Sequence, residues 1–324
     1  MPLQTVGWMS KGGLMLHLPS EQAPEGSLLD GKNIFIDWGF VKRASGYSKL
    51  TTTLLNGPVW LIEQAFRADE TTELVACTSA SFYKFASDTG APTLVGSPFT
   101  STAKPQFFQV AHQVDKLHIT NGTDNVQTWD GTSLATWPFR FVNVLPVDPN
   151  KIICKTIASN GSRMFLGNIK EVRTGHPDQD YQSRIIWTEA GTSTDLNQLW
   201  WIDFFDTPGP IFVILPLREA MMIYKKYAVY SAVEAGPPFV VEAQLISRYN
   251  GLLGPGAVTS FVDPDGIQKH LLVAMDNIYL FDGTRMEPIG DPVKSKLFQN
   301  YNPEYLSSIR CVDNQQDQEV WILY

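Results

Sequence analysis

The chain has 324 residues, of which 44% are hydrophobic, 12% aromatic and 18% charged, with 24 glycines and 21 prolines. This much apolar residue with so little charge excludes a disordered chain. A formal net charge of -8 argues against a general nucleic-acid binder, which usually carries a basic face. The abundance of aromatic, glycine and proline residues favours many short strands joined by tight turns.

Strands of four to eight residues, bounded by Gly, Pro, Asn or Asp, follow one another along most of the chain. One unit recurs: an apolar strand, a second strand, an aromatic strand that ends in a turn, and a fourth strand. The five copies open with Val59 to Phe66, Phe107 to Ala111, Lys151 to Ala158, Ile211 to Leu217 and Val258 to Val262. The aromatics that mark the third strands are Phe85, Trp129, Trp187, Tyr230 and Phe281. Their spacing is close to the roughly 40 to 50 residues of propeller blades, and four antiparallel strands make one blade.

The two ends of the chain look like halves of one more blade. Their strands are Asn33 to Asp37, Phe40 to Arg43, Ser308 to Val312 and Glu319 to Tyr324. Joining the first and last segments in one blade closes a ring without exposed sheet edges. The sequence therefore predicts an all-β fold, a β-propeller of six blades whose last blade is shared between N- and C-terminal strands. The alternative is a pair of β-sandwiches with coincidental Asp-Gly hairpins.

Residues 1–30 are expected to form an N-terminal arm, and residues 31–324 the propeller domain. The chain stops inside an apolar strand, which favours a sequence that continues beyond Tyr324. Helical periodicity is nearly absent, and the short candidates are Asp195 to Leu199, part of Asp291 to Asn300, and Pro303 to Ser308.

Several short motifs are predicted to be turns. Asp130-Gly131 and Asp282-Gly283 have the hairpin-turn pattern, in which glycine supplies a positive φ. Asn121-Gly122-Thr123 and Asn160-Gly161-Ser162 are expected to be turns rather than sugar acceptors. Trp129-Asp130 lacks the Gly-His pair that precedes the Trp-Asp dipeptide of WD40 repeats. The Asp-box motif of sialidases is also excluded, because no residue separates Asp130 from Gly131.

The three cysteines, Cys77, Cys154 and Cys311, lie far apart without zinc or redox spacing, and are predicted to be buried apolar residues in a reducing compartment. Met1 to Ser10 lacks the charged start and apolar run of a signal peptide. No stretch of about 18 apolar residues appears, so no membrane span is expected. The sequence predicts a soluble, non-secreted chain.

No catalytic, cofactor-binding or metal site is predicted. A propeller glycosidase needs paired carboxylates at the ring axis, and the inner strands offer Asp37, Glu63, Asp115 and Glu189 without a neighbour that marks a general acid. The acidic segments Asp263 to Gly266 and Asp313 to Glu319 lack the alternating ligands of a calcium loop and are predicted to be hairpin tips. The five histidines are dispersed: His17, His112, His118, His176 and His270.

Two further segments have a structural and a functional interpretation. Lys225-Lys226, flanked by Tyr224 and Tyr227, is predicted to tip a hairpin rather than to grip DNA. Gly251 to Gly256 has a proline where a phosphate-binding loop would start its helix, so a rigid loop between blades is expected.

Three segments together resemble the β-propeller tail hub or nozzle proteins of short-tailed bacteriophages, also called packaged-DNA stabilisation proteins. The first is Asp30 to Tyr47, in which an Asn and the Asp37-Trp38-Gly39 hairpin precede a basic turn that ends at Gly46-Tyr47. The second runs from Arg184 through Gly191 to Asp195 and Trp200. The third runs from Ile246 through Gly254-Pro255 and Asn277 to Gly283, and ends at Pro288-Ile289-Gly290.

The resemblance implies a non-enzymatic structural protein of the virion tail, assembled in the host cytoplasm as a homo-oligomeric ring of six subunits. Such a ring would extend the DNA channel, retain packaged DNA, contact portal and adaptor proteins, and support fibres or spikes. Viral DNA would pass through the lumen without sequence recognition, and neither a small-molecule substrate nor a cofactor is implied. Chains of this family commonly continue beyond the corresponding point into an insertion or tip domain. The alternatives are a propeller glycoside hydrolase and a monomeric propeller that binds proteins or glycans.

Overall fold

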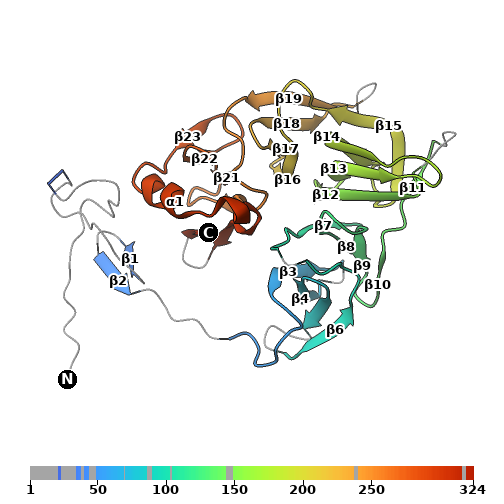
Figure 1. The fold of residues 1–324 in the computed structure, drawn as a ribbon, viewed down its shortest axis with the longest axis horizontal. Helices are drawn as coiled ribbons and strands as arrows, with labels where there is room; N and C mark the ends of the chain where they lie inside the picture. The colour runs from blue at the N-terminus through green and yellow to red at the C-terminus, as the bar shows by residue number, and fades with distance from the viewer. Residues whose placement is uncertain are drawn as a thin grey trace.

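The computed structural model describes residues 21–22, 34–37, 40–43, 49–68, 70–85, 90–102, 104–143, 149–236, 240–315 and 319–324. Within these ranges, small antiparallel sheets stand side by side around a common centre (Figure 1). The predicted all-β propeller is confirmed, but it has five complete blades rather than six. None of the helices in the described ranges is long and apolar enough to cross a membrane.

The five blades, A to E, follow one another in chain order. Blade A contains β3 (Val59–Phe66), β4 (Thr72–Thr78), β5 (Phe82–Phe85) and β6 (Pro92–Gly96). Blade B contains β7 (Gln109–Gln113), β8 (Lys116–Thr120), β9 (Gln127–Trp129) and β10 (Leu134–Thr136). Blade C contains β12 (Lys151–Ser159), β13 (Met164–Val172), β14 (Gln179–Thr188) and β15 (Asp195–Asp203), with β11 (Arg140–Phe141) added in parallel to β15.

Blade D contains β16 (Ile211–Leu217), β17 (Ala220–Lys225), β18 (Val229–Glu234) and β19 (Val241–Ser247). Blade E contains β20 (Val258–Val262), β21 (Gln268–Val273), β22 (Ile278–Phe281) and β23 (Met286–Pro288). It is followed by α1 (Lys294–Asn300), the 3-10 helix η1 (Pro303–Ser308), and the strands β24 (Arg310–Asn314) and β25 (Glu319–Leu323).

The first strand of a blade lies nearest the centre, where β3 contacts β7, β7 contacts β12, and β12 contacts β16 (Figure 1). The second strand of each blade is largely buried, because the neighbouring blades cover both of its faces. In β8 the run Leu117 to Thr120 is wholly buried, and in β21 the same holds for His270 to Val273. These apolar runs are the part of the sequence that specifies the blade.

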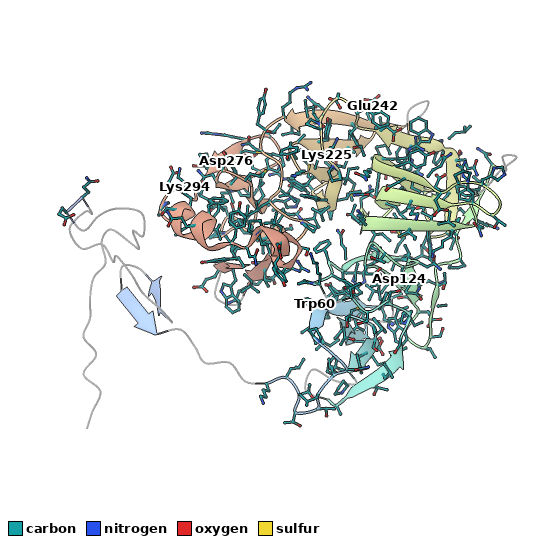
Figure 2. The ribbon with its side chains drawn as sticks, in the orientation of Figure 1. Trp60, Asp124, Lys225, Glu242, Asp276 and Lys294 are labelled. Carbon is teal, nitrogen blue, oxygen red and sulfur yellow. The ribbon has the colours of Figure 1, made fainter. Side chains whose placement is uncertain are left out.

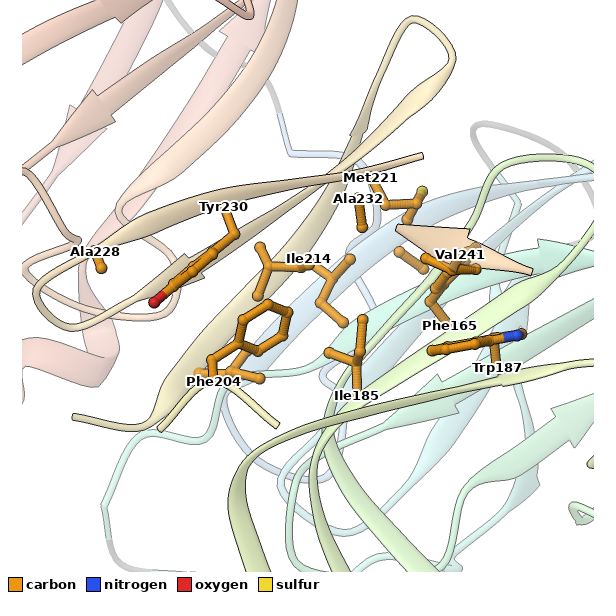
Figure 3. Close-up of a cluster of buried hydrophobic side chains, with 13 residues drawn as sticks. Phe165, Ile185, Trp187, Phe204, Ile214, Met221, Ala228, Tyr230, Ala232 and Val241 are labelled. Atoms are coloured by element: carbon orange, nitrogen blue, oxygen red, sulfur yellow. The ribbon is translucent and has the colours of Figure 1, made fainter. Parts of the chain in front are cut away.

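Apolar clusters join each blade to the next. Between blades C and D, Phe165, Ile185 and Trp187 of blade C pack against Ile214 and Tyr230 of blade D (Figure 3). Equivalent clusters join A to B, B to C, D to E, and E to the segment that holds α1 and β24. Full burial of a large apolar side chain stabilises a fold by about 1.5–3 kcal/mol, so these contacts hold the blades together.

The predicted sixth blade, shared between the two ends of the chain, is wrong. β24 and β25 form a two-stranded sheet, and β1 (Ile34–Asp37) pairs with β2 (Phe40–Arg43) in another. We call the β24–β25 sheet the half-blade. Among the described residues, no apolar cluster joins it to blade A, whereas Leu271, Ile309 and Cys311 belong to the cluster that fixes it to blade E. The error has a physical cause. The alternation of apolar and polar residues along a hairpin indicates that its two strands pair with each other, but it does not indicate which third strand they join.

The Gly251 to Gly256 loop is a close-packed connection that leads into blade E, as predicted. A Cβ at Gly254 would lie 2.2 Å from the carbonyl oxygen of Leu306, and one at Gly256 would lie 2.2 Å from that of Ile309. Only glycine permits so close a backbone approach. These glycines let η1 and the start of β24 lie against blade E.

Two of the three helix predictions are confirmed, at Pro303 to Ser308 and within Asp291 to Asn300. The third is wrong, because Asp195 to Leu199 lies in β15. There Arg140 makes a bidentate ion pair with the Asp195 carboxylate, with N–O distances of 2.7 and 2.8 Å. Pairing with β14 and β11 overrides the weak local helical pattern.

The predicted turns are confirmed. Gly131 and Gly283 have φ values of +94° and +100°, and the preceding aspartates accept backbone N–H groups of the turn. Asn121 and Asn160 accept N–H groups in their own turns. Asp263 does so in the tip between β20 and β21.

All three cysteines are reduced and buried, as predicted. Burial raises the pKa of the Cys154 and Cys311 thiols to about 12 and raises that of Cys77 as well. Apart from residues 21 and 22, the predicted arm at 1–30 lies outside the described residues, as does His17.

Candidate functional site

The centre of the propeller holds a buried polar network that links three blades. Gln109 of β7 donates from Nε2 to the carbonyl oxygen of Ile214 in β16, at 2.8 Å. The Thr156 hydroxyl of β12 donates to Gln109 Oε1 at 2.6 Å and accepts the Ile214 N–H at 2.7 Å. Thr156 is fully buried and Gln109 nearly so. The inner strands of different blades do not share a backbone ladder, so these side chains supply the missing hydrogen bonds.

A bulge in β13 extends this polar contact between blades C and D. Asn168 has a φ of +54° at the point where the register between β13 and β14 shifts. Asparagine tolerates this left-handed conformation better than most residues. The bulge directs its side-chain amide to the carbonyl oxygen of Ile211, at 2.8 Å.

Beside Asn168 lies a cavity of about 580 Å³, which we call the axial cavity. Its walls come from the loops that lead into β7, β16 and β20, from the turn after β8, and from β12 and β13. Apolar lining is supplied by Pro105, Phe107, Pro210, Phe212 and Pro255. A volume of this size is in the range of small-ligand sites.

The charged residues around the axial cavity are cations. Lys104 and Lys155 line it, and no Asp or Glu is among its lining residues. Behind Phe107, the Arg310 guanidinium lies 4.9 Å from the ring centroid and donates to backbone carbonyls, including that of Gln106 at 2.9 Å. Burial lowers the pKa of Arg310 to about 10, which leaves it charged at neutral pH.

The carboxylates considered for a glycosidase do not gather at this centre. Glu63 faces His112, with 3.9 Å between Oε1 and Nε2. Asp115 accepts the Ala68 N–H at 2.7 Å in a tight turn, and Glu189 lies beyond the end of β14. The side chain of Asp37 lies outside the described residues. Within the described part of the chain, no three His, Cys, Asp or Glu side chains are placed to hold a metal ion.

Two of the dispersed histidines are buried within blades. His270 contacts the Tyr224 hydroxyl through Nδ1 at 2.6 Å and the Pro216 carbonyl oxygen through Nε2 at 3.1 Å. A carbonyl only accepts, so Nε2 carries the proton and Nδ1 accepts from Tyr224. Burial lowers the pKa of both His118 and His270 to about 4. They are neutral structural residues at pH 7.

The Lys225-Lys226 pair lies at the end of the β17–β18 hairpin, as predicted, but Lys225 does not face solvent. Its side chain is fully buried, and Nζ donates to the carbonyl oxygens of Phe204 and Thr207, each at 2.6 Å (Figure 2). Burial lowers its pKa. Lys226 lies over the Tyr227 ring, 5.1 Å from its centroid.

Sequence reasoning missed the residues that shape the centre: Gln109, Thr156, Asn168 and Arg310. The one signal available was a polar residue inside an otherwise apolar inner strand, as in Phe107 to Ala111. That signal does not say which residues meet, because the network joins positions more than 40 residues apart in the chain.

No family model and no curated protein sequence matches this chain. Among solved structures, the extracellular domain of the hybrid two component system BT4673 from B. thetaiotaomicron is similar, with a TM-score of 0.51 and 13% identity over 85% of this chain. The match spans 32% of that chain, about a third of its length. The N-terminal domain of Nup159 aligns over 95% of this chain and 78% of its own, with a TM-score of 0.43 and 10% identity. At such low identity, the first likeness supports the propeller fold alone.

Proposed function

We propose that this protein is a non-enzymatic structural component of a bacteriophage tail, with a nozzle or hub role. Copies of the chain assemble into a ring, for which we propose six subunits. The ring extends the DNA channel, helps to retain packaged DNA, and carries fibres or spikes below the portal and adaptor. The proposal rests on the resemblance of three segments to tail nozzle proteins and on one feature of the fold, the half-blade.

The half-blade supports the proposal because the sequence of its strand β25 is typical of a buried strand. β25 is the second strand after the centre, a position that is largely buried in β4, β8, β13, β17 and β21. Its run Val320 to Leu323 is equally apolar, yet its residues are half-buried and Leu323 is 51% exposed. Among the described strands, β25 pairs with β24 alone.

An apolar strand that pairs with one described strand only can be a template for pairing with another chain. We propose that strands of a neighbouring subunit cover β25 in the assembled ring. A contact between two different surfaces of the same chain repeats from one copy to the next. It generates a closed ring when the rotation between neighbouring copies adds up to a full turn. The net charge of -8 is compatible with a lumen along which DNA slides with little adhesion.

The glycoside hydrolase alternative has less support. Retaining or inverting hydrolysis needs two carboxyl groups that flank one bond, and the axial cavity is lined by Lys104 and Lys155 without an Asp or Glu. A monomeric binding propeller differs from the tail protein in its solution mass, so one measurement separates them.

The test is the native mass by light scattering at rising protein concentration, for the wild type, Leu323→Lys and a matched control. Val262→Lys is the control, because Val262 is also an exposed apolar residue, 61% exposed, at the end of a strand in blade E. We expect a closed ring for the wild type and for Val262→Lys, and a monomer for Leu323→Lys. A monomeric wild type that does not enter tail particles in a phage-infected lysate would refute the proposal. A Leu323→Lys ring as stable as the wild-type ring would refute the role of β25.

A further inference from the structure

The axial cavity has a local charge opposite to that of the whole protein. The chain has a formal net charge of -8, yet the charged residues in the cavity lining are Lys104 and Lys155. Among the described residues, no carboxylate lies within 4 Å of either ammonium group. Two cations without acidic partners in one concave site attract an anion.

The walls of the cavity are largely apolar. Pro105, Pro210 and Pro255 each precede the first strand of a different blade, and Phe107 and Phe212 lie between them in the lining. A proline ring fixes φ and removes the backbone donor, so these walls offer surface for packing and little hydrogen bonding. A preformed apolar site with a few polar groups is the usual setting for a small ligand.

Arg310 adds positive potential from behind the Phe107 wall. Its guanidinium donates to backbone carbonyl oxygens of Gln106 and Ile309, at 2.9 Å each. No carboxylate among the described residues pairs with it, so its charge is not neutralised locally. The cavity therefore has two lysines in its lining and a third cation packed against its Phe107 wall.

We propose that the axial cavity binds a small organic anion, a carboxylate or a phosphate monoester attached to a compact apolar body. The apolar body packs between the prolines and the two phenylalanines, and Lys104 and Lys155 bind the anionic group. The inference stands independently of the tail role, because it depends on the cavity of one subunit and not on the assembly of several copies.

The test is isothermal titration of the protein with three probes that share one ring system: 1-naphthyl phosphate, 1-naphthoate and the neutral 1-naphthalenemethanol. We expect one site per chain and at least about tenfold tighter binding of an anion than of the alcohol, which corresponds to about 1.4 kcal/mol. The order of the phosphate and the carboxylate identifies which anion the lysines prefer.

The variants are Lys155→Gln, Lys104→Gln and their combination. Both lysines are exposed, so folding should be preserved, and each change should weaken anion binding about fivefold to tenfold while leaving the alcohol unchanged. Lys294→Gln is the control, because Lys294 lies on α1 and is not among the residues that line the cavity. It should leave every affinity unchanged.

Thr123→Phe supplies a second, charge-independent readout. Thr123 is an exposed residue of the cavity lining, so a larger side chain there should block all three probes. Equal affinity for the alcohol and the anions, or anion binding that survives both the double lysine variant and Thr123→Phe, would overturn the proposal. Absence of measurable binding by all three probes to the wild type would overturn it too.

Discussion

Replacement of Thr156 by valine tests whether the central polar network holds the blades together. Valine keeps the shape of threonine but removes the hydroxyl, which donates to Gln109 and accepts the Ile214 N–H. The change removes two buried hydrogen bonds, each worth about 0.5–1.5 kcal/mol net, and leaves the Ile214 N–H without an acceptor, at about 1–3 kcal/mol. Thr156→Val should therefore lower the free energy of unfolding by about 2–4 kcal/mol.

The assay is urea denaturation followed by tryptophan fluorescence, with thermal unfolding in parallel. For a chain of this length, the loss corresponds to a decrease in Tm of roughly 3 to 6 °C. The urea midpoint should fall with an unchanged slope, because the folded surface is the same. Thr93→Val is the control: Thr93 is exposed in β6, and its change should stay within about 0.5 kcal/mol of the wild type.

A double-mutant cycle with Gln109→Leu separates the network from the effect of a single lost hydroxyl. Because the two side chains are hydrogen-bonded to each other, the effects of the two changes should not add, and the coupling should exceed about 0.5 kcal/mol. A Thr156→Val protein as stable as the wild type, or strictly additive effects in the cycle, would refute the reasoning.

Two further predictions concern buried ionisable groups. Lys225→Met leaves two backbone carbonyls without their donor and should lower the free energy of unfolding in urea by about 2–4 kcal/mol. The control Lys226→Met should change it by less than about 0.5 kcal/mol, and equal effects of the two variants would contradict the burial argument. The pKa of His270 is about 4 in the fold against about 6.5 unfolded, so the unfolded state binds more protons between these values. The contribution of neutral His270 to the free energy of unfolding is complete above about pH 6.5 and decreases as the pH falls to about 4. A His270→Gln protein whose free energy of unfolding has the same pH slope as that of the wild type would refute this assignment.

The repeat of strands was readable from the sequence because every blade obeys the same local rules. Second strands such as Leu271 to Val273 are continuous apolar runs, and turns such as Asp282-Gly283 end the third strands. These patterns are local, so they predict strands and hairpins without knowledge of the ring. The prediction of a helix at Asp195 to Leu199 was wrong for the complementary reason. β15 forms because it pairs with β14 and β11, and its own sequence does not indicate a strand.

The arrangement at the centre of the propeller could not be predicted from the sequence, because its residues come from different blades. Gln109, Thr156 and Ile214 meet only once three inner strands are side by side. The carboxylates Glu63 and Asp115 looked equally suitable for the axis, yet one faces His112 and the other caps the Ala68 backbone. Residue type and strand position alone do not distinguish a side chain at the centre from one at the end of a blade.

A propeller requires polar groups at its centre, because inner strands of neighbouring blades have no ladder of their own to satisfy their backbone. In this chain the requirement is met by neutral amides and hydroxyls, such as those of Gln109 and Thr156, while the charges at the cavity are Lys104 and Lys155. In the proposed ring of subunits, assembly depends instead on β25. No residue of β25 lines the cavity, although Leu323 lies opposite Arg310 in the β24–β25 pair. Leu323→Lys should therefore abolish ring formation, while the binding of 1-naphthyl phosphate should still depend on Lys104 and Lys155.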